Sequence, residues 1–443
     1  MAQLSPARKM ALEVTAAVRM RNAYAHNLID SRVNTSSLNG SDKSFASLLI
    51  LGVVSTSGTL DYIINRNLNR PTDVRDNVRD ALRISVYELV ALEKEPPIVI
   101  DQGVELVKSI ASHAGGLANA VLRKVARDIK GFPWGDPAKD DRALAVRYGF
   151  PQWLTERLIE ELGREAAERF MRTSNEPPPL YIAVNAVKAN DAEVLRMLNG
   201  ALANASFTDD GPIGCIKAEN SANALRSPAL RKGYALICDA SAQTTAHVAR
   251  FMPRRTYLEV GSGRGTKTIL LQSFAKREYG EQATIYALDK HAYKEEVATK
   301  RGQLYGLQNV VQVTGDALEL DRLNLPRRFD GAFIDAPCSG IGTLRRHPEI
   351  RWRVTPQSIT GMADLGYDIL CSVASHIAYR GSIVYSTCTV THEENEDVIQ
   401  RFLDTSLGSQ FFIQPIEQCR YVSVPLDSKG PDAHFVVRLM RRG

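Results

Sequence analysis

From residue 257 onward, the chain alternates short apolar runs with segments of helical spacing. The apolar runs cover 257–260, 284–288, 310–314, 329–334 and 382–385, and the helical patterns cover 267–278, 293–305 and about 356–379. Strands that alternate with helices form a mostly parallel sheet covered by helices on both faces. Such a sheet binds ligands in the crevice outside the carboxyl ends of its strands. The alternation therefore predicts a doubly wound α/β domain over 239–443, with a ligand site at those strand ends.

The first 130 residues carry helical patterns throughout. Their apolar residues recur at helical spacing over six stretches. These are 6–27, 41–54, 59–67, 73–92, 98–111 and 117–130. The pattern predicts an all-α bundle over residues 1–132, which ends in a breaker-rich boundary at 131–137.

A third pattern lies between these two regions. A helical stretch over 140–172 is followed by prolines at 177–179, which neither a helix nor a central strand tolerates. Residues 181–187 then alternate like a strand. We therefore expect a small α+β linker module over 133–238 and a multidomain chain.

The composition excludes several classes of protein. The 443 residues are 44% hydrophobic and 24% charged, as in ordinary globular domains. No uninterrupted apolar run reaches the roughly eighteen residues that span a bilayer, and the first residues lack the apolar region of a secretion signal. The six cysteines include no C-x-x-C pair, so we expect neither a disulfide framework nor a metal site. These features predict a cytoplasmic protein with free thiols and no membrane partner.

The net charge of +5 is mild, and most of the positive excess lies in the first 130 residues. A basic helical domain permits a polyanionic partner such as RNA but does not establish one.

A glycine-rich loop closes the first predicted strand of the α/β domain. It reads Glu259-Val260-Gly261-Ser262-Gly263-Arg264-Gly265-Thr266-Lys267. Alternate glycines let a ligand approach the backbone at a helix N-terminus. A dinucleotide fingerprint would place its third glycine at position 266, which is a threonine. The spacing E-x-G-x-G-x-G is instead that of class I methyltransferases, which favours S-adenosylmethionine over NAD.

Two aspartates follow the next two predicted strands. Asp289 ends the second strand, where a carboxylate can accept the ribose hydroxyls of a nucleoside cofactor. Asp316 follows the third strand and is placed for the adenine end. For each aspartate taken singly, the alternative is a solvated strand end or a helix cap.

Two cysteines follow the last two predicted strands. Cys338 lies just beyond Asp335, and Cys388 lies in the sequence S-T-C-T. Because parallel strands end at one edge of a sheet, we expect Asp335, Cys338 and Cys388 to meet in one cleft. A thiol and a carboxyl group are what cytosine C5 methylation needs: a thiolate adds to C6, an acid assists near N3, and a base removes the C5 proton. For the other cysteines we expect ordinary small buried side chains; these are Cys215, Cys238, Cys371 and Cys419.

These motifs resemble those of known RNA-modifying enzymes. Residues 330–352, which contain D-A-P-C-S-G, resemble motif IV of RNA cytosine-C5 methyltransferases, and 381–396, which contain S-T-C-T and E-E-N-E, resemble their motif VI. Residues 84–89, 104–108 and 117–124 resemble the NusB-like RNA-binding domain. The whole chain is similar to the Sun/Fmu family, bacterial enzymes that methylate cytosine 967 (rRNA numbering) of 16S ribosomal RNA.

The resemblance implies a role for each motif residue. Cys388 would attack C6, Cys338 would help to release the product, and Asp335 would hold the base near N3 beside the cofactor. The residues implied in S-adenosylmethionine binding are Glu259, Gly261, Ser262, Gly263, Arg264, Gly265, Thr266, Lys267, Asp289, Asp316 and Asp335. The implied partner is 16S rRNA or a small-subunit precursor, bound by a protein that we expect to be a monomer.

Two features depart from the family or leave a choice open. The cofactor loop lacks the family wording D-x-C-A-A-P-G-G-K-T, and His434 stands where an apolar residue is expected. Arg345, Arg346 and Arg351 form the densest basic patch and are expected to contact RNA phosphates, with a solvated loop as the alternative. Trp352 suits either stacking on a base or packing.

Two other functions fit the same residues. One is a methyltransferase for another RNA, such as tRNA, because the two cysteine motifs would look the same. The other is a non-catalytic RNA-binding or ribosome-assembly factor that kept the fold after its cofactor loop changed. A DNA methyltransferase is not expected, because those enzymes lack the second cysteine motif. The sequence leaves open the target nucleotide and whether the substrate is free RNA or an assembled particle.

Overall fold

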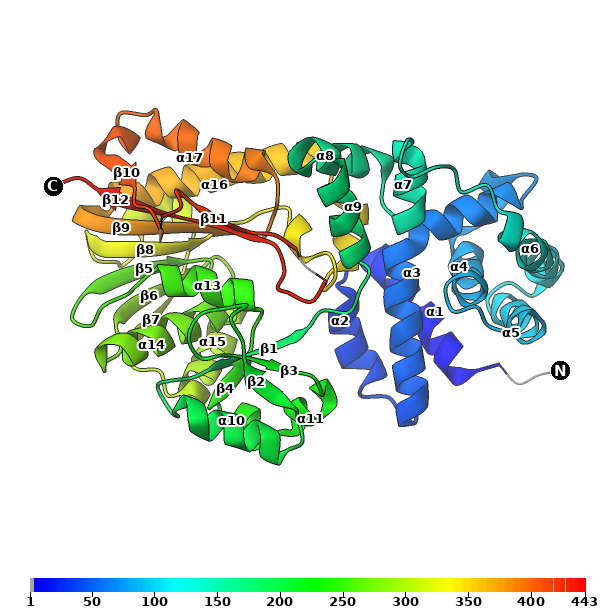
Figure 1. Cartoon of the computed structure of the whole chain (residues 1–443), viewed down its shortest axis with the longest axis horizontal. Coiled ribbons are helices and arrows are strands. Elements are labelled where there is room, and N and C mark those ends of the chain that lie inside the picture. The colour runs from blue at the N-terminus through cyan, green and yellow to red at the C-terminus, as the bar shows by residue number, and fades with distance from the viewer. Residues whose placement is uncertain (1–3, 417, 427) are drawn as a thin grey trace. The chain divides into compact units, whose positions relative to one another are not determined.

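The computed structural model describes residues 4–416, 418–426 and 428–443. The chain divides into two compact units. One consists of Met1–Pro177 with Leu344–Arg353, and the other of Pro178–Thr343 with Val354–Gly443. A short segment of the C-terminal half is therefore built into the N-terminal unit. Figure 1 shows the helices of the first unit in blue to teal and the large sheet of the second in green to red.

The first unit is built from helices. They are α1 (Pro6–Arg21), α2 (Ala25–Leu28), α3 (Gly40–Arg66), α4 (Asp76–Val90), α5 (Pro96–Lys108), α6 (Gly115–Asp128), α7 (Asp141–Tyr148), α8 (Gln152–Leu162) and α9 (Arg164–Thr173). In α4, Val78, Leu82 and Leu89 recur at helical spacing and lie in the core of this unit. The all-α fold predicted for the N-terminal part is confirmed.

Two predicted helix boundaries in this unit are wrong. α1 ends at Arg21 instead of reaching residue 27, because Asn22 takes a left-handed conformation with φ of 50°. The stretches predicted as two helices over 41–54 and 59–67 form the single helix α3. Thr56 only kinks α3, and its hydroxyl donates to the Gly52 carbonyl oxygen at 2.7 Å, a contact that bends helices.

Helix α3 is long and apolar enough, by its averaged hydropathy, to qualify as a candidate membrane span. The sequence pattern had not indicated this, because polar residues interrupt its apolar run. In the structure, Leu49, Ile50 and Val53 of α3 are buried in the core of the first unit. The core helix of a globular unit meets the same length and composition criteria.

A small antiparallel sheet begins the second unit, in the order β2–β3–β1–β4. Its elements are β1 (Leu180–Val184), α10 (Asp191–Gly200), β2 (Ala205–Phe207), β3 (Cys215–Ala218), α11 (Ser221–Arg226), α12 (Pro228–Arg231) and β4 (Ala235–Ile237). Val194 of α10 and Ile216 of β3 share its core. The α+β fold expected for this module is confirmed, although the helical stretch predicted over 140–172 belongs to the first unit. The first strand of the module ends at 184 instead of 187, because a turn starts at Asn185. The Asn185 carbonyl oxygen accepts a hydrogen bond from the Lys188 amide at 3.1 Å.

The large sheet has the order β10–β12–β9–β8–β5–β6–β7, with β11 paired to β12. Its strands are β5 (Thr256–Val260), β6 (Thr284–Asp289), β7 (Val310–Thr314), β8 (Phe329–Asp335), β9 (Ile377–Thr387), β10 (Phe411–Ile413), β11 (Val422–Val424) and β12 (His434–Arg441). The five strands from β5 to β9 are parallel, whereas β10, β11 and β12 pair antiparallel. The predicted doubly wound, mostly parallel sheet is confirmed.

Helices cover both faces of this sheet (Figure 1). They are α13 (Ala240–Val248), α14 (Thr266–Tyr279), α15 (Ala292–Tyr305), α16 (Pro356–Ser375) and α17 (Glu396–Leu403). Successive strand residues point to opposite faces, so Leu258 lies in the core under α16 and α17, whereas Tyr257 lies in the core under α13 and α14. Burial on both faces explains why these strands read as continuous apolar runs.

β9 begins five residues before the predicted run at 382. Ile377 pairs with Phe329, and Ser382 then pairs with Gly331, so the residues between them form an irregular bulge. Arg380 within it has φ of 61°, which is typical of a bulge. α16 correspondingly ends at Ser375 instead of residue 379.

Candidate active site

The path of the chain through the large sheet marks a crevice beside β5. From β5 the chain passes outward through β6 and β7, and it returns to β8 and β9 on the other side of β5. Open α/β sheets bind ligands at such a switch point, outside the carboxyl ends of the strands. Val260 pairs with Ile334, so the glycine loop after β5 and Asp335 at the end of β8 leave the sheet side by side.

The glycine loop has a backbone that side chains would not permit. Gly261, Gly263 and Gly265 have φ of 79°, 57° and 79°. A Cβ atom on Gly261 would lie 2.6 Å from the Asp335 carbonyl oxygen, so β8 leaves room there for glycine alone. A Cβ atom on Gly263 would meet only the Gly261 carbonyl oxygen, at 3.8 Å, among the described residues. The loop is therefore fixed at its base and open at its tip.

Hydrogen bonds hold the rest of the loop. The amides of Gly261 and Ser262 both donate to the Leu288 carbonyl oxygen, at 3.0 and 3.1 Å. Arg301 of α15 donates to the Arg264 carbonyl oxygen at 2.8 Å and to the Thr266 hydroxyl at 3.0 Å. The loop thus keeps its shape without the cysteine and proline of the usual family wording.

Asp289 lies beside this loop. Its carboxylate accepts from the Gly263 amide at 2.9 Å and from the Lys294 ammonium at 3.1 Å. Asp316 caps the turn after β7 and pairs with Lys290 at 2.8 Å, and this hydrogen bond lowers the pKa of Asp316. Asp289 therefore ends β6 and Asp316 follows β7 at the edge of the sheet that carries the loop, and their cofactor contacts stay a prediction.

A buried acid and a charged pair lie behind the loop. Glu259 is fully buried, and its Oε2 accepts from the Thr268 hydroxyl at 2.7 Å while its Oε1 has no partner among the described residues. Burial raises the pKa of Glu259 to about 7. The Lys267 ammonium lies 3.0 Å from Asp335. Burial alone lowers the pKa of Lys267, but the Asp335 carboxylate more than offsets this, and the net pKa is raised.

The two motif cysteines meet at the ends of β8 and β9. Asp335 pairs with Ser386 in the parallel register, which brings the two following loops together. The Sγ atoms of Cys338 and Cys388 lie 3.3 Å apart, and the Cys388 amide donates to the Cys338 sulfur at 3.3 Å. The hydrogen bond with the Cys388 sulfur and burial both raise the pKa of the Cys338 thiol. The structure therefore brings Asp335, Cys338 and Cys388 to one edge of the sheet, as the sequence predicts.

A third strand braces this meeting point. The Gly342 amide donates to the Cys388 carbonyl oxygen at 2.9 Å, and the Ala433 amide donates to the Gly342 carbonyl oxygen at 3.1 Å. A Cβ atom on Gly342 would lie 2.3 Å from the Ala433 carbonyl oxygen, so only glycine fits there. The cysteine loops are thereby tied to the start of β12.

The structure also accounts for His434. Its ring is buried, and its Nδ1 lies 2.7 Å from the Ser241 hydroxyl, which in turn donates to Asp239 at 2.6 Å. Burial lowers the pKa of His434, and the positive charge of Lys267 adds to the effect. A polar site at the start of α13 thus holds a neutral histidine in place of an apolar side chain.

Arg351 does not lie where an RNA phosphate could reach it. Its side chain is fully buried in the first unit, where its guanidinium stacks on Phe150 with its centre 4.2 Å from the ring centroid. It donates to the carbonyl oxygens of Ser55 and Ser174 at 3.1 and 3.3 Å, and to the Asn175 side chain at 2.8 Å. The prediction that Arg351 contacts RNA is therefore wrong, because the segment that carries it is built into the helical unit.

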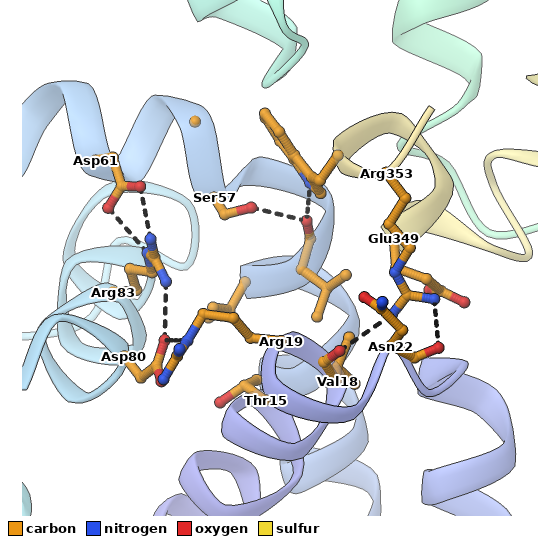
Figure 2. Close-up of a pocket in the computed structure, with 14 residues that line it drawn as sticks. Thr15, Val18, Arg19, Asn22, Ser57, Asp61, Asp80, Arg83, Glu349 and Arg353 are labelled. Atoms are coloured by element: carbon orange, nitrogen blue, oxygen red, sulfur yellow. Dashed lines mark hydrogen bonds and ion pairs between the residues drawn. The ribbon is translucent and has the colours of Figure 1, made fainter. Parts of the chain in front are cut away.

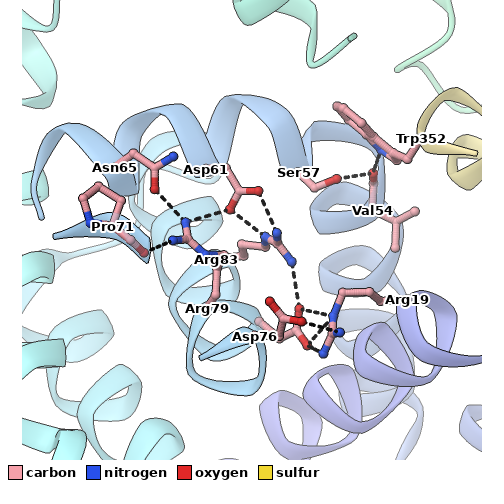
Figure 3. Close-up of polar contacts among 11 residues, drawn as sticks. Arg19, Val54, Ser57, Asp61, Asn65, Pro71, Asp76, Arg79, Arg83 and Trp352 are labelled. Atoms are coloured by element: carbon pink, nitrogen blue, oxygen red, sulfur yellow. Dashed lines mark hydrogen bonds and ion pairs between the residues drawn. The ribbon is translucent and has the colours of Figure 1, made fainter. Parts of the chain in front are cut away.

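The neighbours of Arg351 anchor the same segment. The Trp352 indole donates to the Val54 carbonyl oxygen at 2.7 Å (Figure 3), so Trp352 packs against α3 and is not free to stack on a base. Arg353 donates to the Val18 and Ala23 carbonyl oxygens at 3.1 and 2.7 Å. Of the other two arginines, Arg345 is 6% exposed and Arg346 is half-buried, which leaves Arg346 as the more accessible candidate for an RNA contact.

A cavity of about 280 Å³ lies between this segment and helices α1, α3 and α4 (Figure 2). Its charged walls are bonded to one another. Arg19 pairs with Asp80 at 2.8 Å, and Arg83 bridges Asp61 at 2.6 Å and Asp80 at 2.8 Å (Figure 2). These contacts hold α1, α3 and α4 together, so the pairs have a structural explanation.

The described residues contain no cluster of three or more His, Cys, Asp or Glu side chains suited to a metal ion. Cys215 and Cys238 are buried and Cys371 is half-buried, whereas Cys419 is exposed. The expectation of a buried thiol is therefore wrong for Cys419.

Sequence reasoning missed one buried acid in the site. This acid is Glu394, which lies six residues after Cys388 in the chain. Its side chain is 1% exposed. The sequence signal that could have revealed Glu394 was the acidic run E-E-N-E. This run belongs to the stretch that resembles motif VI, but no role was assigned to its residues. Spacing alone could not tell which of its three carboxylates turns inward.

Three parts of the chain match known families. Residues 5–127 match the NusB family, residues 150–216 match the ferredoxin-like domain of RsmF/B-like methyltransferases, and residues 248–424 match the family described as 16S rRNA methyltransferase RsmB/F. The "Probable ribosomal RNA small subunit methyltransferase B" of Bacillus subtilis is 29% identical over 98% of this chain and 99% of its own length. The Synechocystis sp. protein of the same description is 29% identical over 90% of this chain and 89% of its own.

Solved structures share the fold. The crystal structure of PH0851 has a TM-score of 0.80 at 20% identity and covers 99% of both chains. The structure of NSun6 from Pyrococcus horikoshii has a TM-score of 0.58 at 16% identity and covers 66% of this chain and 99% of its own.

The large sheet has a glycine loop at its switch point and helices on both faces, which defines a class I methyltransferase fold. This fold follows a NusB-like domain in the chain. The family matches along its length and the names of its relatives support the RsmB-type Sun/Fmu family with a NusB-like N-terminal domain, which the chain resembles. It is therefore an RNA methyltransferase.

Proposed function

We propose that the protein methylates carbon 5 of a cytosine in RNA, using S-adenosylmethionine and a covalent bond between Cys388 and C6. The target is cytosine 967 (rRNA numbering) of 16S rRNA. The observation that carries this proposal is the 3.3 Å separation of the Cys338 and Cys388 sulfur atoms, which lie in the loops after β8 and β9 beside Asp335. C5 methylation requires one reactive thiol and one carboxyl group, and this edge of the sheet supplies both, with a second thiol beside the first.

The residues around the glycine loop suit S-adenosylmethionine. The backbone at Gly263 is open, and the buried Oε1 of Glu259 lacks a donor among the described residues. The residues that hold the cofactor are Glu259, 261–267, Asp289, Asp316 and Asp335. When bound, S-adenosylmethionine supplies an electrophilic methyl group to C5. A structural relative, NSun6, was solved with SFG, an analogue of this cofactor, which supports the assignment.

Cys388 begins the reaction as a thiolate. Its sulfur bonds to C6, and the electrons of the C5–C6 double bond move so that C5 becomes nucleophilic. Asp335 holds the base near N3 and stabilises the charge that develops there. The Lys267 ammonium, 3.0 Å from Asp335, keeps this carboxylate oriented. A cytosine must leave its stack to reach Cys388, because C6 is inaccessible inside one.

Cys338 completes the reaction. After C5 is methylated, a base removes the C5 proton, the C5–C6 double bond forms again and the Cys388 sulfur departs. Cys338 keeps its proton in the free enzyme, because the Cys388 sulfur next to it raises its pKa. Once that sulfur is bonded to C6, the hydrogen bond and its effect on the pKa are lost, so Cys338 gives its proton to solvent more readily. Its thiolate can then accept the C5 proton when the product must be released.

The relatives support the choice of substrate. Their descriptions name the RNA of the small ribosomal subunit. We assign the helical domain (1–132) and the linker module (133–238) to RNA binding, and 239–443 to catalysis. The protein acts as a monomer in the cytoplasm, where this RNA is processed.

Methyl transfer to isolated RNAs tests the proposal. Protein and S-adenosylmethionine are incubated with 16S rRNA fragments that contain or lack position 967, and with tRNA, and the modified nucleoside is identified by mass spectrometry. We expect 5-methylcytosine only in fragments with position 967. Transfer to tRNA instead would favour the other enzyme. Failure to bind S-adenosylmethionine at millimolar concentration in calorimetry would favour an assembly factor.

A further inference from the structure

Glu394 lies beneath the two cysteine loops, in the turn η8 (His392–Glu394) that follows β9. Its Oε1 accepts from the Ser339 amide at 2.5 Å, and its Oε2 accepts from the Ser339 hydroxyl at 2.7 Å. Oε2 also accepts from the hydroxyls of Thr389 and Thr391, at 3.1 and 2.6 Å. One carboxylate therefore receives four hydrogen bonds from two separate segments of chain.

These donors stand next to the reactive sulfurs. Ser339 directly follows Cys338, and Thr389 directly follows Cys388. The hydroxyls of Ser339 and Thr389 also lie 2.8 Å apart, so the three side chains form a closed ring. Glu394 is thus joined by hydrogen bonds to the residue after each cysteine, fifty residues apart in the chain.

We propose that Glu394 is a positioning residue that holds the Cys338 and Cys388 sulfurs at the distance the reaction needs. The effect of Glu394 on the reaction rests on the proposed function, whereas its contacts with the two cysteine loops are independent of that function. Hydrogen bonds to an ionised carboxylate are shorter and about twice as strong as those between neutral groups. A buried carboxylate with four donors therefore fixes the two loops relative to each other.

The negative charge has a second effect on the pair. The pKa of Cys338 is raised chiefly by the hydrogen bond with Cys388, by burial and by the charge of the Cys388 sulfur. The charge of Glu394 raises it further. Its charge helps Cys338 to keep its proton until the product must be released. Geometry and charge can be separated, because a glutamine has the same shape, and the hydroxyls of Thr389 and Thr391 can rotate to accept from its amide.

Three variants separate the two effects. Glu394→Gln keeps the shape and removes the charge, whereas Glu394→Ala removes both. Ser339→Ala removes one hydroxyl from the opposite side of the ring and covers the case in which Glu394→Ala fails to fold. Glu393→Gln is the matched control, since this neighbouring carboxylate accepts from Thr360 of α16 at 2.5 Å, away from the cysteines.

The first readout is cross-linking of the two thiols with dibromobimane. Each thiolate displaces one bromide, and the bridged product fluoresces. We expect wild type, Glu394→Gln and Glu393→Gln to cross-link at similar rates, and Glu394→Ala and Ser339→Ala to lose most of the bridged product. The variant Cys338→Ala gives the background from other cysteines. Equal cross-linking in wild type and Glu394→Ala would overturn the proposal, whether or not the protein methylates RNA.

The second readout is steady-state methyl transfer. A misplacement of ~1 Å reduces a rate by about 100-fold, so kcat should fall by that order in Glu394→Ala while KM for RNA stays within about twofold. Glu394→Gln should recover most of kcat. A Gln variant as inactive as the Ala variant would overturn the positioning role and leave the charge as the cause. An inactive wild type with intact cross-linking would refute the proposed function and leave the clamp standing.

Discussion

The Lys267 ammonium and the Asp335 carboxylate lie 3.0 Å apart, one at the start of α14 and the other at the end of β8. Their contact joins the cofactor loop to the strand that leads into the cysteine loop. Lys267 is almost fully buried, whereas the Asp335 side chain is about one third exposed. The pair therefore orients a carboxylate that solvent and substrate can still reach.

Replacing Asp335 with Asn should reduce methyl transfer by about 100-fold or more, because the carboxyl group near N3 is lost. It should also lower the free energy of unfolding by about 1–2 kcal/mol, a value reduced for the exposure of Asp335. The raised pKa of Lys267 means that the stabilisation is complete below its ordinary value of 10.5 and is lost as the pH rises through the raised value. Chemical denaturation at several pH values measures this.

The exposed Asp364, which pairs with Arg401 on the surface at 2.6 Å, supplies the control. Asp364→Asn should change neither methyl transfer nor stability by a measurable amount. An Asp335→Asn variant with the activity of wild type would remove Asp335 from the reaction.

Glu259→Gln should change how stability depends on pH. Burial raises the pKa of Glu259 from 4.5 to about 7, so the folded state binds more protons than the unfolded state in this range. The contribution of Glu259 to stability is therefore largest below pH 4.5, falls as the pH rises towards 7, and is smaller by about 3 kcal/mol above it. Glutamine cannot ionise, so the variant should lose this contribution and be more stable than wild type at pH 8. Equal slopes in both proteins would show that Glu259 is ionised when folded.

Gly58→Ala should have opposite effects in two backgrounds. Alanine in a helix is ordinarily more favourable than glycine by about 1 kcal/mol. At Gly58, however, the added Cβ atom would lie 2.6 Å from the Trp352 ring, which its hydrogen bond to Val54 holds in place (Figure 3). Gly58→Ala should therefore destabilise wild type and stabilise the Trp352→Ala variant, as a double-mutant cycle of unfolding free energies would reveal. The same sign in both backgrounds would contradict the contact.

Arg346 and Arg351 should respond differently to substitution. If Arg346 contacts a phosphate, Arg346→Ala weakens RNA binding for all sequences and lowers the slope of log affinity against log salt by about 1. Arg351→Lys should leave that slope unchanged and lower stability by about 2–3 kcal/mol, because lysine cannot make the same contacts from a buried site. RNA titrations at several salt concentrations distinguish the two. A changed salt slope for Arg351→Lys would mean that the buried arginine does reach RNA.

The large sheet and its cleft followed from the sequence because their signals are local. Apolar runs gave the strands, and glycine spacing gave the loop at Gly261. Parallel pairing of β8 and β9 requires that the residues after these strands meet at one edge of the sheet. The sequence alone therefore predicted that Asp335, Cys338 and Cys388 lie together.

The failures concern packing between distant segments. The basic run around Arg351 has the composition of a surface loop, and only the tertiary fold buries it beside Phe150. The inward turn of Glu394 depends on Ser339, fifty-five residues earlier in the chain. Thr56 kinks α3 without ending it, because packing of the apolar faces on either side holds the helix together.

The proposed reaction passes through a covalent bond between Cys388 and RNA, and this bond can be trapped. Cys338→Ala protein is mixed with S-adenosylmethionine and 16S rRNA, denatured and separated on a gel, beside a Cys338→Ala/Cys388→Ala control. We predict a protein–RNA adduct in the single variant, because release fails while attack proceeds, and none in the double variant. An adduct that persists without Cys388, or no adduct where wild type transfers methyl groups to the same RNA, would contradict the account.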